Sequence, residues 1–286
     1  MNIAFLVSGG LGEFVLNHFI KRYNLSFVLT DKSSENIVNI CYAHKIPVYA
    51  GNPRKSEING FLKEKSCDVM VSVNYLFIID ERVIKLAKRL CFNVHGSLLP
   101  KYRGRTPHVW AIINNESETG ITAHVIDEGC DTGDILKQIK VKIEQEDTGA
   151  SILERYKELY IPLVESILSD FVQDELTFFK QDESKATYFG IRTPEDGRIN
   201  WNWSVERIIN WARAQAAPYP GAFTFYKNKK LIIDKVSKSE NGFHFEVENG
   251  TILSTSPLLV KCCNSVLEIE TIRDGEIEFD INEKFD

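Results

Sequence analysis

Residues 91–107, CFNVHGSLLPKYRGRTP, indicate how this chain folds and where its chemistry lies. The apolar run at residues 91–94 predicts a buried strand, yet Asn93 interrupts this run and His95 follows it. Polar side chains in a buried strand cost free energy unless they are paired or used, so we expect a catalytic group at the carboxyl end of the strand. The glycines and proline of residues 96–104 predict a loop after it.

Asn93 and His95 are two residues apart and therefore project from the same face of an extended strand. An imidazole can exchange a proton near neutral pH, and an amide can donate to an oxygen that gains negative charge. A satisfied polar pair that only ends the strand explains the spacing equally well. The loop carries three cations, Lys101, Arg103 and Arg105, which suit an anionic ligand.

Apolar runs alternate with helical patterns before and after this stretch. Strands are predicted at residues 2–8, 26–30, 47–50, 68–73 and 91–94, with helices near 14–20, 34–44, 56–64, 80–89 and 107–114. This alternation predicts an α/β fold, a Rossmann-like and mainly parallel sheet with helices on both faces. Strands at 119–127 and 135–143 would extend the sheet, before a long helix at 148–176 that Thr148 caps and Pro162 kinks or divides.

The 286 residues allow one large domain and a smaller one. We predict a Rossmann-like domain at residues 1–185 and a smaller C-terminal domain at 186–286, with one helix followed by a small β-rich module. The helix is expected at 205–216, and strands at 223–226, 231–236, 243–247, 251–254, 258–262 and 266–272. Asn249-Gly250 predicts a hairpin turn.

Bulk composition excludes several classes of protein. A formal net charge of -6 argues against broad nucleic-acid binding, which needs clustered Lys and Arg. None of the six cysteines has the C-x-x-C spacing of a zinc or redox site, so buried reduced thiols are expected. No signal peptide and no membrane-length apolar run is apparent, which predicts a cytoplasmic protein without a membrane partner.

Three further stretches each allow more than one interpretation. The glycine loop at residues 8–12 could hold a dinucleotide, but its spacing is not G-x-G-x-x-G and close strand-to-helix packing is favoured. The acidic connection at 127–134 could bind Ca²⁺ or Mg²⁺, could orient His95 through one carboxylate, or could be solvated. The turn at 192–198 and the tryptophans after it could bind a nucleotide or form a solvated linker with a tryptophan core.

Two motifs, FNVHGSLLPKYRG at residues 92–104 and ETGITAHVIDEGCDTGDIL at 118–136, closely resemble the signature of the 10-formyltetrahydrofolate-dependent formyltransferases. That family includes methionyl-tRNA formyltransferase and the sugar N-formyltransferases. The resemblance implies that residues 1–185 are the catalytic domain, and that Asn93, His95 and Asp131 are the catalytic set. It implies no metal, and it places the folate across the strand ends, with its pterin held largely by backbone groups, near Asn74, Tyr75, Leu76, Ile78, Ile79, Asp127 and Gly129.

The segments RGRTPHVWAIIN at 103–114 and RTPEDGRINW at 192–201 look like the branch that acts on nucleotide-linked amino sugars. This resemblance implies formyl transfer to a sugar amine, a role in lipopolysaccharide or O-antigen biosynthesis, and a homodimer. The residues expected to bind substrate are Lys101, Arg103, Arg105, Arg192, Arg198 and Trp211. The alternatives are a methionyl-tRNA formyltransferase and, from another class, a non-catalytic folate or nucleotide-sugar binding protein.

Overall fold

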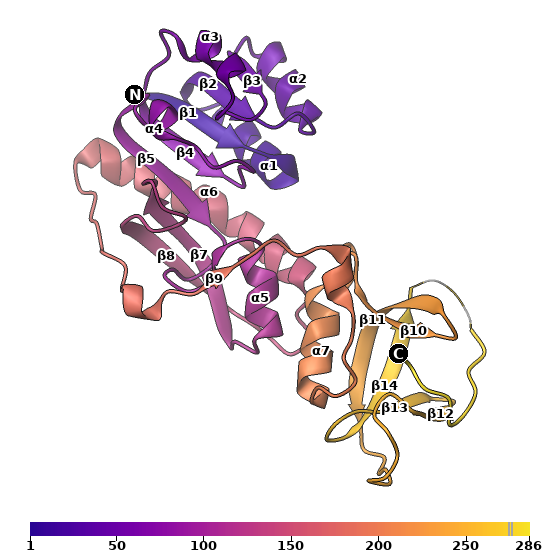
Figure 1. The fold of residues 1–286 in the computed structure, drawn as a ribbon. Helices are drawn as coiled ribbons and strands as arrows, with labels where there is room; N and C mark the ends of the chain where they lie inside the picture. The colour runs from indigo at the N-terminus through magenta and orange to yellow at the C-terminus, as the bar shows by residue number, and fades with distance from the viewer. Residues whose placement is uncertain (274, 276) are drawn as a thin grey trace. The chain divides into compact units, whose positions relative to one another are not determined.

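The computed structural model describes residues 1–273, 275 and 277–286 (Figure 1). Its contacts divide the chain into two compact units. The first unit comprises Met1–Gly104, Gly120–Val141 and Tyr156–Tyr188, and the second comprises Arg105–Thr119, Lys142–Arg155 and Phe189–Asp286. The chain therefore passes between the units several times, and the predicted domain boundary between residues 185 and 186 stays a prediction.

A seven-stranded sheet, in the order β3-β2-β1-β4-β5-β7-β8, organises the first unit. Its strands are β1 Asn2–Val7, β2 Asn24–Thr30, β3 Val48–Ala50, β4 Cys67–Val73, β5 Ala87–His95, β7 Glu118–Val125 and β8 Ile135–Lys142. The first five are parallel, and β7 runs antiparallel to β5. The predicted Rossmann-like, mainly parallel sheet is confirmed, and so is its extension by the two later strands.

Helices cover both faces of this sheet. Successive residues of a strand point to opposite faces, and consecutive residues of β1 are buried, so apolar side chains on both faces are covered. On one face, Ala4 and Leu6 of β1 join a core cluster with Ile58 and Val83. Ile58 belongs to the segment η1 Ser56–Ile58 and Val83 to α4 Glu81–Ile84, and Leu62 of α3 Asn59–Leu62 packs against the cluster. On the other face, the ring of Phe5 packs 5.4 Å from that of Phe19 in α1 Gly9–Phe19. Helix α2 Glu35–Ala43 follows β2.

One helix prediction in this region was wrong: the helix expected at 80–89 ends at Ile84, because residues from Ala87 onward pair with β4 as part of β5. Helix α6 Gly149–Gln173 continues through Pro162, so the proline does not divide it, and the buried stripe on either side of the proline keeps the helix packed. The kink expected as the alternative stays a prediction. The predicted cap is confirmed, since Oγ1 of Thr148 accepts a hydrogen bond from the Ser151 N–H at 3.1 Å.

The second unit contains a five-stranded sheet in the order β10-β11-β14-β13-β12. Its elements are α5 Pro107–Ile113, η3 Pro194–Gly197, α7 Val205–Ala214, β10 Ala222–Tyr226, β11 Lys229–Ser239, β12 Ile252–Thr255, β13 Leu258–Lys261 and β14 Val266–Ile272. The β-rich module is confirmed. The strand expected at 243–247 is absent, so the turn at Asn249-Gly250 does not join two paired strands and the hairpin prediction was wrong.

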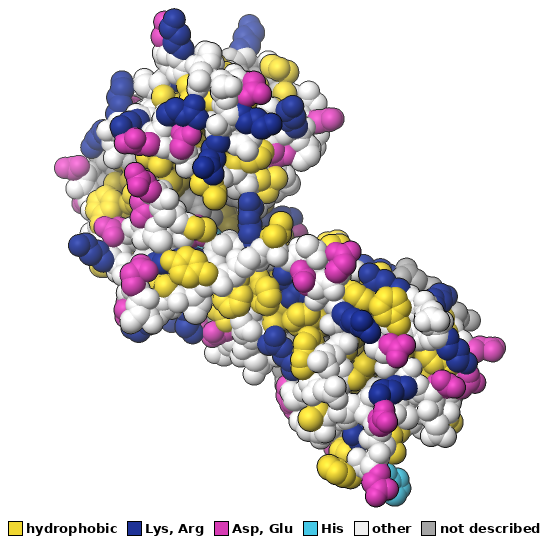
Figure 2. Space-filling view, viewed as in Figure 1, with side chains coloured by type: hydrophobic (Ala, Val, Ile, Leu, Met, Phe, Trp, Pro, Cys, Tyr) yellow, Lys and Arg dark blue, Asp and Glu magenta, His cyan; other side chains and the backbone are white. Residues whose placement is uncertain are grey.

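Short elements complete the chain, and its surface carries charges of both signs. The strands β6 Arg103–Gly104 and β9 Tyr188–Phe189 pair with each other, and the segment η2 Glu183–Lys185 lies between them in sequence. Figure 2 shows Lys and Arg side chains distributed among Asp and Glu on the face in view. In the described ranges, no helix has both the length and the apolar composition that crossing a bilayer requires.

Candidate active site

Three strand ends of the first unit meet at the candidate site. Because β4 and β5 are parallel and Val73 pairs with Val94, the residues that follow them leave the sheet at the same edge. Strand β7 runs antiparallel to β5, and its register places His124 directly across from Asn93. Polar side chains from β5 and β7 are thereby brought within reach of the loop that follows β7.

A carboxylate of that loop lies between two imidazoles. Oδ2 of Asp131 lies 3.6 Å from Nδ1 of His95, and Oδ1 lies 3.5 Å from Nε2 of His124. The same Nε2 lies 3.2 Å from Nδ2 of Asn93. The three residues predicted as a catalytic set therefore lie together, and His124 links Asn93 to Asp131.

Asp131 is held in place by the backbone around it. It adopts the left-handed conformation, with φ of 57°, which Asp tolerates better than most residues. The Gly104 N–H donates to Oδ2 at 2.9 Å, and Nε2 of Gln181 donates to the Asp131 carbonyl at 2.8 Å. Burial opposes ionisation, but the two imidazoles and the Gly104 N–H outweigh it and hold the pKa of Asp131 below its ordinary value. The site therefore contains a carboxylate at neutral pH.

His95 is fixed by a carbonyl rather than by the carboxylate. Its ring is 7% exposed, and Nε2 lies 2.8 Å from the carbonyl oxygen of Tyr102, so Nε2 carries the proton of the neutral ring. Burial lowers the pKa of His95 against the opposing effect of Asp131. The neutral ring consequently has its lone pair on Nδ1, the nitrogen that faces Asp131. Nδ1 of His95 can therefore take up a proton beside the negative charge of Asp131.

Interpretation of the sequence did not single out His124. Its ring is 3% exposed and lies edge-on to that of His95, with centroids 6.4 Å apart. His124 belongs to the motif at residues 118–136 and lies in a largely buried strand. A polar residue in a buried strand is also the pattern that indicated His95. An antiparallel pairing of the two strands would have brought it opposite Asn93.

The expected folate positions after β4 differ in how far they are exposed. Leu76 and Ile78 are 41% and 64% exposed, whereas Ile79 is buried. Asn74 has φ of 54°, and its Nδ2 donates to the carbonyl of Ser8 at 2.9 Å. The ring of Tyr75 lies edge-on to that of Phe77, and its buried hydroxyl has no hydrogen-bond partner among the described residues. The segment after β4 could therefore offer an apolar surface to a flat ligand.

The second expected folate segment is the turn that begins at Asp127. Its Oδ1 accepts hydrogen bonds from the Gly129 N–H at 3.0 Å and from Oγ1 of Thr132 at 2.6 Å. A Cβ on Gly129 would lie 1.9 Å from that same hydroxyl oxygen, so the turn requires glycine. The Asp127 side chain thus shapes the loop, and backbone groups are what it can present to a ligand.

Arg103, expected to bind substrate, is buried and engaged within the protein. Its guanidinium is fully buried and donates to Oε1 of Gln181 at 2.7 Å and to Oε1 of Glu183 at 2.6 Å. It also donates to the Tyr188 hydroxyl and stacks on that ring, 5.2 Å from the centroid. Lys101, in the same loop, is exposed. Arg103 is therefore occupied by contacts within the protein, unlike the exposed Lys101.

In the second unit, Arg192 lies between two tryptophan rings. Its guanidinium carbon is 4.9 Å from the ring centroid of Trp110 and 4.3 Å from that of Trp211. Desolvation lowers the pKa of Arg192, and its buried Nη1 has no partner among the described residues. Trp211 is 7% exposed and its indole N–H donates to a carbonyl, so it supports Arg192 rather than offering a face to a ligand. Arg105 is exposed.

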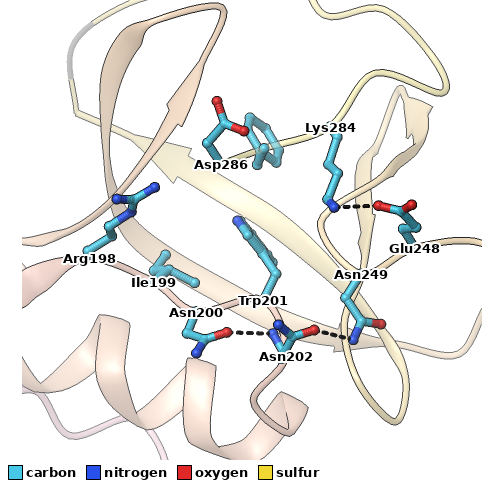
Figure 3. Close-up of a pocket in the computed structure, with 10 residues that line it drawn as sticks. Arg198, Ile199, Asn200, Trp201, Asn202, Glu248, Asn249, Lys284 and Asp286 are labelled. Atoms are coloured by element: carbon cyan, nitrogen blue, oxygen red, sulfur yellow. Dashed lines mark hydrogen bonds and ion pairs between the residues drawn. The ribbon is translucent and has the colours of Figure 1, made fainter.

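Arg198 differs from Arg192 in being exposed. It lines a pocket of about 600 Å³ in the second unit with the side chains of Asn200, Asn202 and Lys284 (Figure 3). Within the described residues its guanidinium makes no hydrogen bond or ion pair and packs over Phe225, 5.5 Å from the ring centroid. It is therefore able to meet an anion.

The glycine loop serves packing, as the sequence favoured. A Cβ on Gly12 would lie 2.9 Å from the Cβ of Val7, so glycine lets α1 approach β1. Asp31, at the position where a dinucleotide-binding fold places its ribose-binding acid, is buried. Its carboxylate accepts from the hydroxyls of Ser33 and Ser34. Among the described residues, no group of three or more His, Cys, Asp or Glu is arranged to hold a metal ion.

Comparison with family models decides the relationship. The model described as "Formyl transferase" matches residues 19–164, and the model described as "Formyl transferase, C-terminal domain" matches residues 192–284. The chain belongs to the formyl transferase family. The resemblance stated from the two motifs is confirmed, and the described fold agrees with it.

Individual proteins that are similar to this formyl transferase agree with the family assignment. The bifunctional polymyxin resistance protein ArnA of Wigglesworthia glossinidia brevipalpis is 38% identical over 229 residues, which is 79% of this chain and 34% of ArnA. The formyl transferase therefore spans about a third of that relative's length. WlaRD, a sugar 3N-formyl transferase solved with dTDP and 5-N-formyl-THF, matches with a TM-score of 0.70 at 20% identity, covering 96% of this chain and 99% of WlaRD.

An N-formyltransferase from Helicobacter canadensis, solved with folinic acid and dTDP-3-aminofucose, has a TM-score of 0.68 at 21% identity. The match covers 94% of this chain and 98% of that protein. At these identities the two solved structures establish the common fold alone.

Proposed function

We propose that this formyl transferase moves the formyl group of 10-formyltetrahydrofolate to the primary amine of an amino sugar linked to a nucleoside diphosphate. The observation that carries the proposal is the cluster of the buried His95 with the partly buried Asn93 and Asp131 in the first unit. Such a cluster combines an amide donor, a neutral imidazole and a carboxylate, which formyl transfer to an amine requires.

The proposed reaction begins when the neutral amine attacks the formyl carbon. A carbon–nitrogen bond forms, the carbonyl oxygen becomes an oxyanion, and Nδ2 of Asn93 donates to it. The amine's proton moves to Nδ1 of His95, because Nε2 already donates to the Tyr102 carbonyl. The resulting imidazolium lies beside the carboxylate of Asp131. The bond to folate N10 then breaks, and His95 returns the proton to that nitrogen.

The folate co-substrate is proposed to lie near the segment after β4 and the turn at residues 127–131. The exposed Leu76 and Ile78 offer apolar contacts, and the backbone of the turn offers polar ones. Structural relatives solved with formyl-folate compounds support a folate as the co-substrate. Among the cations, Lys101, Arg105 and Arg198 are the exposed candidates for anionic groups of folate or of the nucleotide.

Three observations favour a sugar over charged tRNA as the acceptor. The net charge is -6, and tRNA binding depends on clustered cations. Lys and Arg side chains are mixed with acidic ones on the face shown in Figure 2. The relatives solved with dTDP or a dTDP-sugar support a nucleotide-linked acceptor. We also propose residues 1–185 as the catalytic domain and a cytoplasmic homodimer as the working form.

The test is a panel of nucleotide-linked amino sugars incubated with the protein and 10-formyltetrahydrofolate. We expect mass spectrometry to detect a formylated sugar and stoichiometric tetrahydrofolate. His95→Ala should abolish turnover, whereas His18→Ala, which breaks a hydrogen bond between α1 and α6, should keep it. Formylation of charged initiator tRNA with every sugar left unchanged would overturn the sugar proposal. Full turnover by His95→Ala would overturn the mechanism.

A further inference from the structure

His124 is a buried titratable group that the proposed reaction does not use. It faces Asn93 across the β5–β7 ladder, the ring of His95 lies beside it on the same strand as Asn93, and Asp131 faces it from the loop after β7. Its Nε2 has two polar neighbours, Nδ2 of Asn93 at 3.2 Å and Oδ1 of Asp131 at 3.5 Å. Only the first distance falls within the usual range of a nitrogen-donated hydrogen bond, about 2.7 to 3.2 Å.

The backbone decides which nitrogen of His124 carries its proton. Nδ1 lies 2.9 Å from the carbonyl oxygen of Val125. A carbonyl oxygen can only accept, so Nδ1 is the donor, and a neutral ring then has its lone pair on Nε2. The amide nitrogen of Asn93 can only donate, which matches that lone pair. The hydrogen bond therefore runs from Asn93 to His124.

This bond also determines the orientation of the Asn93 amide. If the amide were turned over, its Oδ1 would face the lone pair of Nε2, and both atoms would be acceptors. Neutral His124 therefore holds Nδ2 in place with one hydrogen engaged. The second hydrogen of Nδ2 remains for another acceptor, and that hydrogen is the one required for oxyanion stabilisation.

We propose that His124 is a positioning residue, whose neutral Nδ1–H form orients the Asn93 amide so that Nδ2 donates to the oxyanion of formyl transfer. This inference rests on the proposed function, because the oxyanion forms only in that reaction. A cationic His124 would present an N–H at Nε2 in place of the lone pair. That N–H would attract Oδ1 of Asn93 or of Asp131 and would turn the donor away from the reacting carbonyl.

The first test reads the hydrogen bond without turnover. Nitrogen-15 NMR of the full chain at neutral pH should show His124 protonated at Nδ1 and accepting at Nε2, and Asn93→Ala should shift the Nε2 resonance. Protonation at Nε2 with a bare Nδ1 would overturn the inference whatever the activity. Wild-type protein that shows the expected tautomer but formylates no sugar would instead count against the proposed function.

The second test is a double-mutant cycle. His124→Leu, which removes the acceptor, should lower kcat about 10-fold to 100-fold, less than the full loss of an oxyanion donor, with KM values little changed. His124→Gln offers a carbonyl oxygen near the position of Nε2 and should recover most of that loss. In an Asn93→Ala background, His124→Leu should cost nothing further, because its effect passes through Asn93.

Multiplicative losses in that cycle would overturn the proposal, since they would mean that His124 acts independently of Asn93. Equal losses for His124→Leu and His124→Gln would do the same. If His124→Leu does not fold, the NMR measurement on the wild-type protein and on Asn93→Ala still decides the question.

Discussion

Replacing Arg103 by methionine tests whether this buried cation holds the first unit together. The change removes hydrogen bonds to Gln181, Glu183 and Tyr188. Glu183 is 65% exposed, so it returns to water and its loss costs less than about 1 kcal/mol. Oε1 of Gln181 is partly buried and loses both of its donors, which costs about 1 to 3 kcal/mol. Loss of stacking on Tyr188 adds about 0.5 to 1 kcal/mol.

Together these contributions give a loss of about 3 kcal/mol in the free energy of unfolding for Arg103→Met. Urea unfolding followed by circular dichroism measures it. Because the four tryptophans all lie in the second unit, their fluorescence should respond less than the dichroism. In Arg103→Met, the amide hydrogen-exchange rate should increase most at residues 181–188.

Glu183→Gln is the matched control, since it alters only the exposed partner of the pair. We expect it to cost less than about 1 kcal/mol. An unfolding free energy for Arg103→Met within about 1 kcal/mol of the original, or equal losses for the two variants, would refute this reasoning.

Three further predictions concern the site and the sheet. Asn93→Ala should lower kcat for formyl transfer about 100-fold to 1000-fold with little change in KM, as steady-state kinetics can measure. Gly133→Ala would place a Cβ 2.0 Å from the Val125 carbonyl oxygen, so the proposed activity and the melting temperature should both fall. Burial opposes ionisation of Asp31, but the hydroxyls of Ser33 and Ser34 outweigh it and hold its pKa at about 2. This pKa lies below the ordinary unfolded value, so the stability that Asp31→Asn removes should be largest above about pH 4 and disappear as pH falls toward 2 in urea titrations.

The sequence was sufficient to predict the sheet and to single out Asn93 and His95, because local signals agreed with the tertiary fold. Asn93 and His95 stand out as polar groups at the end of an apolar run, and the structure places them at the end of a central strand. Asp131 could be paired with them only through the family motif, since nothing local identifies which carboxylate of the 127–134 connection turns inward. Its contacts with Gly104 and Gln181 join residues 27 and 50 positions away.

The remaining features depend on contacts that a linear pattern does not carry. Arg103 appeared to be a free loop cation, yet its partners lie 78 to 85 residues later. His124 lies in an apolar strand, where a buried structural histidine is the ordinary interpretation. Its significance appears only when the antiparallel register brings it opposite Asn93.

Gln181 has a consequence for how far this protein can be divided into parts. The polar sequence around Gln181 resembles a dispensable linker. However, its side-chain amide nitrogen donates hydrogen bonds to the carbonyls of both Asp131 and Gly133. Cutting the chain before this residue would release the turn that presents Asp131 and would also leave the charge of Arg103 without its acceptors. The proposed catalytic domain at residues 1–185 keeps Gln181 and Glu183, and a fragment or fusion built on it should extend through Tyr188 to keep the third partner of Arg103 as well.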